Sequence, residues 1–229
     1  MTEVGHFSGK TFAFLKDLKE NNNKAWFQEN KNRYEEDVKG PALNFIQDFS
    51  SHLAKLSLHF RADPRASGGS LFRIHRDIRF SKDKSPYKTH TGIQFRHERG
   101  KDAHAPGFYL HLEPKRCFVG VGIWHPDGKT LKKIREAIVE DPKVWKKAVS
   151  GAGFQKRFAL SGDRLVRPPR GFDPDHPLID DLMWKDYVAM AKLTQKSVAE
   201  PGFIKEYAAH CRAGLPLVAF LCKALGLPV

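Results

Sequence analysis

The sequence has little cysteine, no long apolar run and none of the short motifs that would place it in a class at once. Only 3 of its 229 residues are cysteine, and they lie far apart, which argues against a disulfide scaffold and fits a reducing compartment. The longest apolar stretch, residues 215–225, contains Lys223 and is far shorter than the roughly 20 residues of a membrane span. The first ten residues lack a signal-peptide apolar region. We therefore expect a cytoplasmic protein that does not enter a membrane.

Several common site types are also missing. There is no G-x-x-x-x-G-K-S/T phosphate loop, no H-E-x-x-H zinc motif and no G-x-S-x-G nucleophile turn. Gly120 and Gly122 form a G-x-G inside a predicted strand without a third glycine, which is atypical of a dinucleotide site. His90, His97 and His104 lie in a polar segment without cysteine partners, so no metal site is predicted. The sequence leaves any cofactor unknown.

What is abundant is positive charge on an otherwise ordinary globular composition. Hydrophobic residues make up 41% and charged residues 28% of the chain, which is typical of a folded protein. Lys and Arg number 39 against 26 Asp and Glu, giving a net charge of +13. Such a surface favours anionic partners.

The hydrophobic periodicity divides the chain into three blocks. Residues 1–60 and 127–229 carry helical stripes, whereas residues 70–125 alternate with period two. We therefore predict a single α+β domain over residues 1–229, in which a central, mostly antiparallel β-sheet is flanked by N-terminal and C-terminal helices.

Local signals set the expected boundaries. Four residues are suitable helix starts: Ser8, Asn23, Asp127 and Asp141. Gly40-Pro41 is expected to end one helix and begin another, residues 179–196 look helical, and Pro216 is expected to open the last helix. The predicted strands contain the alternating apolar residues Phe72 and Ile74, Ile93 and Phe95, Phe108, Leu110 and Leu112, and Cys117, Val119, Val121 and Ile123.

The last two predicted strands are separated by a short turn at Pro114-Lys115, so they are expected to pair as an antiparallel hairpin. A loop with an even number of residues puts their apolar side chains on one face. The other face then carries Tyr109, His111, Glu113, Phe118, Gly120, Gly122 and Trp124, joined by Arg73, His75, Gln94 and Arg96 if the outer strands follow. This face is either an open polar platform with a glycine floor or the surface on which a helix packs closely over the glycines.

The densest chemical signal is the basic stretch from Arg73 to Thr89. Its cations alternate with apolar residues, a pattern that fixes the segment to the core and leaves the charges available for phosphate or carboxylate groups. The alternative is a solvated loop held by its own ion pairs. The predicted ligand-binding residues are Arg73, Arg76, Asp77, Arg79, Lys84, Tyr87, Lys88 and Arg96.

Residues 76–88, which read RDIRFSKDKSPYK, resemble the hallmark of the conserved hypothetical proteins known as domain of unknown function (DUF) 2461. The resemblance extends over nearly the whole chain. It includes Asn22-Asn23, Trp26-Phe27 and Tyr34, the run from Phe108 to Pro114 with Gly120 and Gly122, the run from Arg167 to Phe172, Asp175-His176-Pro177 and Leu215-Pro216-Leu217. It implies one domain and a cytoplasmic protein of bacterial type. It brings no established activity, cofactor or catalytic residue.

Three functions are compatible with these features. The first is a protein that binds, and can transform, a small anionic, phosphate-bearing ligand in a basic cleft, with Tyr109 and His111 as weak catalytic candidates. The second is a nucleic-acid-binding module that uses the basic surface. The third is a structural or adaptor protein. The oligomeric state is not indicated.

Overall fold

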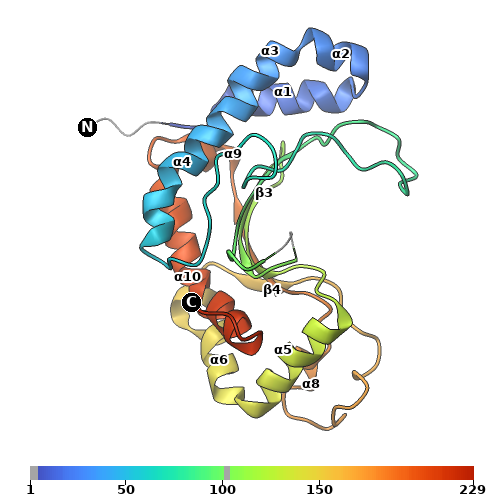
Figure 1. The fold of residues 1–229 in the computed structure, drawn as a ribbon, viewed down its shortest axis with the longest axis vertical. Coiled ribbons are helices and arrows are strands. Elements are labelled where there is room, and N and C mark those ends of the chain that lie inside the picture. Colours follow the sequence, from blue (N-terminus) through green and yellow to red (C-terminus); the bar gives the residue numbers. More distant parts are fainter. Residues whose placement is uncertain (1–4, 101–103) are drawn as a thin grey trace.

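The protein is an antiparallel five-stranded sheet with helices from both ends of the chain around it (Figure 1). The structure is a computed structural model that describes residues 5–100 and 104–229, so the first four residues of the predicted helical block lie outside it. The strands are β1 (Thr91–Arg96), β2 (Gly107–Leu112), β3 (Cys117–Ile123), β4 (Ala159–Ser161) and β5 (Tyr187–Leu193). Their order is β1-β2-β3-β5-β4, and every neighbouring pair is antiparallel. The predicted α+β class is confirmed.

Helices precede and follow the first three strands. The N-terminal ones are α1 (Gly9–Glu20), α2 (Lys24–Glu29), α3 (Lys31–Tyr34), the π-helical segment η1 (Glu35–Lys39) and α4 (Gly40–Ala54). The others are α5 (Gly128–Glu140), α6 (Pro142–Ser150), α7 (Ala152–Gln155), α8 (Ile179–Leu182), α9 (Gln195–Ala199) and α10 (Phe203–Ala224). The four predicted N-caps are confirmed, because the side chains of Ser8, Asn23, Asp127 and Asp141 each accept a backbone N–H of the first helical turn.

The sheet is curved, and its two faces have different neighbours. Figure 1 shows α4 and α10 along the convex side. The buried apolar side chains of the strands join those of α4 and α10 in one large core, whose members include Phe49, Phe108, Val121 and Leu217. Helix α10 approaches β3 closely at Gly214, where a Cβ atom would lie 2.7 Å from a methyl carbon of Val121.

This close approach predicts that Gly214→Ala destabilises the protein by about 1–2 kcal/mol, although alanine is the better helix former. The added methyl group displaces Val121, so Gly214→Ala and Val121→Ala together are expected to cost less than the sum of the two single changes. Urea unfolding of the three variants measures this coupling. Strict additivity would show that the helix has room to move.

Three boundaries differ from the sequence-based expectation. The chain passes from α3 through η1 into α4 without a break, although Pro41 has no N–H to donate to the carbonyl oxygen of Asp37; that oxygen accepts from the Thr11 hydroxyl instead. Pro216 lies inside α10 and does not begin a helix. The expected helix over residues 179–196 is wrong beyond α8, since β5 occupies its second half. Both faces of β5 are largely apolar, so its period-two signal is weak.

The predicted strand at Phe72 and Ile74 is also wrong as a strand. Residues near it form only isolated bridges, Leu71 with Ile93 and His75 with Tyr87. The second bridge closes the base of a projecting loop, residues 75–87, which we call the arm (Figure 1). A second apolar cluster lies where the base of the arm meets the N-terminal helices, and it contains Phe14, Leu15, Leu18, Phe27, Tyr34, Val38, Ile74 and Tyr87. The assignment of residues 1–229 to a single domain stays a prediction. Within the described part of the chain, no helix is long and apolar enough to cross a bilayer.

Candidate functional site

The concave face of the sheet is the platform expected from the hairpin register. Residues 113–116 separate β2 from β3, and Tyr109 pairs with Gly120 while His111 pairs with Phe118. Because side chains alternate across a strand, these four residues share the face opposite the core. On this face β1 adds Gln94 and β5 adds Met190. The described residues do not form the alternative, a helix packed over the glycines, because α10 packs on the other face.

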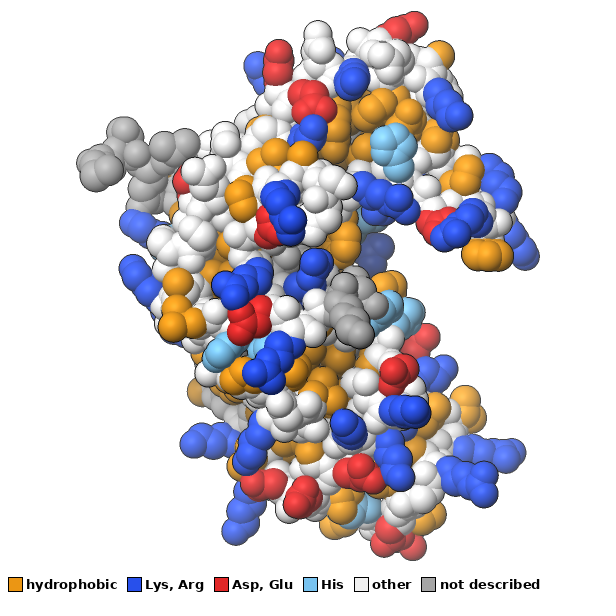
Figure 2. Space-filling view, in the orientation of Figure 1, with side chains coloured by type: hydrophobic (Ala, Val, Ile, Leu, Met, Phe, Trp, Pro, Cys, Tyr) orange, Lys and Arg blue, Asp and Glu red, His pale blue; other side chains and the backbone are white. Residues whose placement is uncertain are grey.

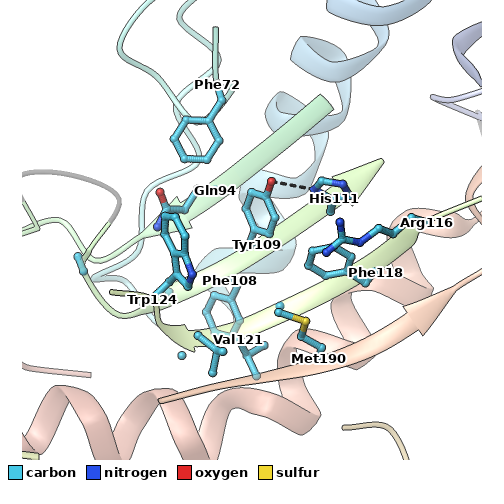
Figure 3. Close-up of a pocket in the computed structure, with 15 residues that line it drawn as sticks. Phe72, Gln94, Phe108, Tyr109, His111, Arg116, Phe118, Val121, Trp124 and Met190 are labelled. Atoms are coloured by element: carbon cyan, nitrogen blue, oxygen red, sulfur yellow. Dashed lines mark hydrogen bonds between the residues drawn. The ribbon is translucent and has the colours of Figure 1, made fainter. Parts of the chain in front are cut away.

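A pocket of about 310 Å³ lies on this face, and we call it the platform pocket. Figure 3 shows Phe72, Gln94 and Trp124 at one end and His111, Arg116 and Phe118 at the other, with Tyr109 between them. The lining residues are Phe72, Gln94, Ala105, Gly107, Phe108, Tyr109, His111, Arg116, Phe118, Gly120, Val121, Gly122, Trp124, Val188 and Met190. The walls are therefore mainly aromatic and apolar, and the volume suits a small organic molecule.

Glycine forms the floor of the pocket for two different reasons. The atoms nearest to a Cβ atom on Gly120 would belong to Tyr109 and Phe118, at 3.6 Å or more, which is ordinary contact, so a side chain is not sterically excluded there. At Gly122 the backbone has φ +119°, and a Cβ atom would lie 2.0 Å from the carbonyl oxygen of Tyr187. Gly122 is thus required by the backbone, whereas Gly120 leaves a flat surface on which a ring can lie.

Three polar residues at positions i, i+2 and i+4 form a hydrogen-bonded chain along one side of the pocket. The Tyr109 hydroxyl lies 3.1 Å from Nδ1 of His111, and Nε2 of His111 lies 3.2 Å from the Glu113 carboxylate. A carboxylate can only accept, so Nε2–H donates to Glu113, and Nδ1 of the neutral ring accepts from the Tyr109 hydroxyl. A Cβ atom on Gly92 would lie 2.6 Å from that hydroxyl, so the missing side chain of Gly92 makes room for it.

The His111 ring is stacked between two other rings. Its centroid lies 4.5 Å from that of His90 and 4.5 Å from that of Phe118. Burial lowers the pKa of His111, an effect that Glu113 partly opposes. Burial, reinforced by His111, lowers the pKa of His90 to about 4. Both imidazoles are therefore neutral near pH 7, and burial also raises the pKa of Tyr109.

Arg116 is the one cationic side chain that lines the platform pocket among the described residues. It is exposed, and its guanidinium carbon lies 5.8 Å from the centroid of the Phe118 ring. The neighbouring position on β5 is the exposed Lys192, which pairs with Phe118 in the sheet. This end of the pocket therefore combines an aromatic surface with positive charge, an arrangement that suits an acidic group on a flat ligand.

The predicted ligand-binding residues lie elsewhere, mostly in the arm, and none of them lines the platform pocket. Arg76 forms an ion pair with Asp83, and Arg79 donates to Asp77 at 2.6 Å. Several cations are bound to backbone carbonyl groups: Lys84 to Ile78, Lys88 to Arg73, and Arg96 to Gly68. The arm cations are thus paired largely within the arm. Figure 2 shows Lys and Arg side chains on both sides of the hollow beneath it.

Two other predicted residues have clear local surroundings. Tyr87 is buried, and its ring stacks on Phe27 with centroids 4.1 Å apart. Its backbone exchanges two hydrogen bonds with the side chain of Asn22, so Tyr87 anchors the arm to the N-terminal helices. Arg73 is exposed. Of the residues singled out from the sequence as catalytic or ligand-binding, only Tyr109 and His111 line the pocket.

The three regularly spaced histidines do not converge. His90 stacks on His111, the Nε2 atom of His97 lies 3.0 Å from the carbonyl oxygen of Pro228, and His104 stacks on Trp124. Within residues 5–100 and 104–229, no group of three His, Cys, Asp or Glu side chains is placed to bind a metal ion.

Sequence reasoning missed Arg116 as part of the site. The signal was present, because Arg116 continues the period-two series of Phe118, Gly120 and Gly122 toward the turn. The contribution of Phe72 was missed for another reason. It reaches the pocket from an irregular segment whose direction no periodicity encodes, and its ring lies 6.1 Å from that of Tyr109.

Comparison with known proteins agrees with the resemblance in the sequence. A search of curated proteins finds no match to the chain. The family model described as conserved hypothetical protein (DUF2461) matches residues 10–220, which include every strand and the platform pocket. The chain belongs to the family of conserved hypothetical proteins DUF2461.

Proposed function

We propose that the protein binds a small molecule with a flat, largely apolar ring system and one acidic group, either a carboxylate or a phosphate. The observation that carries this proposal is the aromatic pocket of about 310 Å³ over the glycine floor at Gly120, with a single arginine at one end among the described residues. The ring lies on the floor beside Tyr109 and Phe118, and the acidic group pairs with Arg116.

The proposal keeps the anionic ligand expected from the sequence and changes the residues that bind it. A pocket with apolar walls gains most from an apolar ligand body, because each buried carbon removes surface from water. One guanidinium supplies the charge-assisted hydrogen bonds that select an acid over its neutral amide. The oxygen of Tyr109, whose proton is donated to His111, is left to accept from a donor group on the ligand. A cytoplasmic location stays a prediction.

A thermal-shift and calorimetric titration with four probes tests this function: benzoate, 2-naphthoate, phenyl phosphate and a thymidine oligonucleotide. At about 100 times its dissociation constant, a ligand adds roughly 2.7 kcal/mol, which raises the unfolding midpoint by several degrees for a chain of this length. We expect 2-naphthoate or phenyl phosphate to produce this shift. Comparison of benzoate with phenyl phosphate shows which acidic group Arg116 prefers.

Two variants make the test specific. Arg116→Gln is expected to weaken binding of the acid by about 10-fold or more, the loss typical of a hydrogen bond to a charged group. Lys115→Asn removes the same charge one residue away, and asparagine suits the φ of 68° at that position, so it should bind like the wild type. Equal binding by the wild type and Arg116→Gln would contradict the assigned role of Arg116.

Nucleic-acid binding is the alternative, and one feature of the arm favours it. Phe80 is 96% exposed at the projecting loop, with Arg79 and Lys82 beside it, and such aromatic and basic surfaces stack the bases of single strands. In that case the oligonucleotide would raise the unfolding midpoint, and the shift would vanish with added salt. Phe80→Ala would abolish the shift, whereas Arg116→Gln would leave it unchanged.

A further inference from the structure

Two residues that the binding function does not use, His125 and Asp186, meet next to Trp124, which lines one end of the pocket. In the sheet Ile123 at the end of β3 pairs with Tyr187 at the start of β5. The chain therefore leaves β3 through Trp124 and His125 beside Asp186, the residue that precedes β5. The pairing of two strands far apart in the sequence thus brings an imidazole and a carboxylate together.

His125 and Asp186 are joined by two hydrogen bonds. One carboxylate oxygen of Asp186 accepts the backbone N–H of His125 at 2.7 Å and lies 2.9 Å from its Nδ1 atom. The Asp186 side chain is only 3% exposed. It fits against Gly162, where a Cβ atom would lie 2.9 Å from the Cβ atom of Asp186. His125 itself has φ +48°, a left-handed conformation that histidine seldom adopts and that Asp186 holds in place.

This geometry decides which nitrogen of His125 can react. Since the carboxylate accepts, Nδ1–H donates to it, and the lone pair of the neutral ring lies on Nε2. The His125 side chain is 54% exposed, and Nε2 has no hydrogen-bond partner within the described residues. The ring also stacks on Trp124 with centroids 4.0 Å apart, and Trp124 lines the platform pocket. His125 does not itself line the pocket, but its ring lies against a residue of the pocket wall.

We propose that His125 and Asp186 form a nucleophilic dyad that cleaves carboxylic esters carrying a flat ring, with the ring placed in the platform pocket. The proposal rests on the proposed binding function, because the pocket positions the ester. Among the described residues neither member of the dyad forms an ion pair with a Lys or Arg, which favours a neutral acyl group over a doubly charged phosphoryl group as the point of attack.

The reaction balances without a cofactor. Nε2 attacks the ester carbonyl carbon, the bond from that carbon to the alcohol or phenol oxygen breaks, and the alkoxide or phenolate leaves with the electron pair. Asp186 stabilises the positive charge that develops on the imidazole ring, as carboxylates do in other nucleophile–base pairs. Water then attacks the acyl carbon and the bond to Nε2 breaks with its electron pair staying on the ring. The proton that the attacking water releases goes to the alkoxide or phenolate, so the products are the free acid, the alcohol or phenol, and neutral His125.

Hydrolysis of 4-nitrophenyl acetate, followed by release of the coloured phenolate, tests the dyad. His125→Asn is the key variant, because asparagine adopts positive φ more readily than histidine and so preserves the backbone. We expect the rate to fall by about 100-fold or more, the usual contribution of such a group. Asp186→Asn keeps an acceptor for the N–H of His125 and is also expected to slow the reaction. Mass spectrometry should find the acetyl group on His125.

A matched control separates this site from general histidine reactivity. His59 also faces a carboxylate, with Nδ1 2.8 Å from Glu98, but its ring stacks on His97, which does not line the platform pocket, whereas His125 stacks on Trp124, which does. His59→Asn should therefore hydrolyse the ester at the wild-type rate. The dyad would be overturned if the wild type and His125→Asn hydrolysed the ester at equal rates. It would also be overturned if the wild type were no faster than the double variant that carries both His59→Asn and His125→Asn. Binding of 2-naphthoate by His125→Asn shows separately whether the pocket function holds.

Discussion

Gly122→Ala is expected to lower the free energy of unfolding by at least about 3 kcal/mol, while Gly120→Ala, two residues away on the same strand, changes it by less than about 1 kcal/mol. The difference follows from the backbone. At Gly122 φ is +119° and an added Cβ atom would lie 2.0 Å from the Tyr187 carbonyl oxygen, so β3 and β5 would have to separate. At Gly120 the nearest atom to an added Cβ is 3.6 Å away, which is ordinary contact.

The two variants should also differ in function. Gly120→Ala keeps the fold and places a methyl group on the floor of the platform pocket, so it is expected to weaken binding of 2-naphthoate by about 10-fold or more. Urea unfolding measures the first effect, and calorimetry measures the second. If Gly120→Ala bound 2-naphthoate as the wild type does, the ring would not lie on this floor.

Acidification from about pH 7.5 to about pH 5 is expected to cost about 2 kcal/mol of stability through His90 alone. Burial and the neighbouring His111 lower the pKa of His90 from 6.5 to about 4, with smaller contributions from Lys88 and Arg116 and an opposing one from Glu113. Between pH 6.5 and about pH 4, His90 binds a proton in the unfolded chain and not in the folded protein, so the free energy of unfolding falls as the pH falls. The loss begins near pH 6.5 and is complete near pH 4.

His90→Phe isolates this effect. Phenylalanine keeps a ring stacked on His111 and cannot be protonated, so the difference in stability between the two pH values should shrink by about 2 kcal/mol relative to the wild type. Urea unfolding of both proteins at both pH values measures it, and carboxylates that titrate in this range cancel in the comparison. An unchanged difference would show that His90 is protonated in the folded protein without penalty.

The platform could be predicted because one argument fixes it. A strict alternation in β2 and β3, joined by a short turn, allows only one register that buries Phe108, Leu110 and Val121 together. Tyr109, His111 and Gly120 must then lie on the other face. Strand β5 could not be predicted in this way, because Ala189 and Ala191 fit a helix as well as a strand and both faces of the strand are largely apolar.

The partners of the charged stretch could not be predicted, because the sequence shows charges and not the groups with which they pair. Arg76 and Arg79 find Asp83 and Asp77 within the same loop. Residues 76–88 lie within the match to the family model, and the structure gives Tyr87 a packing role at the base of the arm. The contact of His125 with Asp186 was beyond prediction, since 61 positions separate the two residues and only the pairing of β3 with β5 joins them.

The central claim is that the concave face of the sheet, and not the arm, holds the ligand. The most direct test is a titration of isotopically labelled protein with 2-naphthoate, followed by nuclear magnetic resonance of the backbone amides and tryptophan side chains. We expect the largest shift changes at Phe118, Gly120 and the indole N–H of Trp124, with Arg116→Gln weakening them. Changes confined to residues 76–88, or no change at millimolar ligand, would contradict the claim.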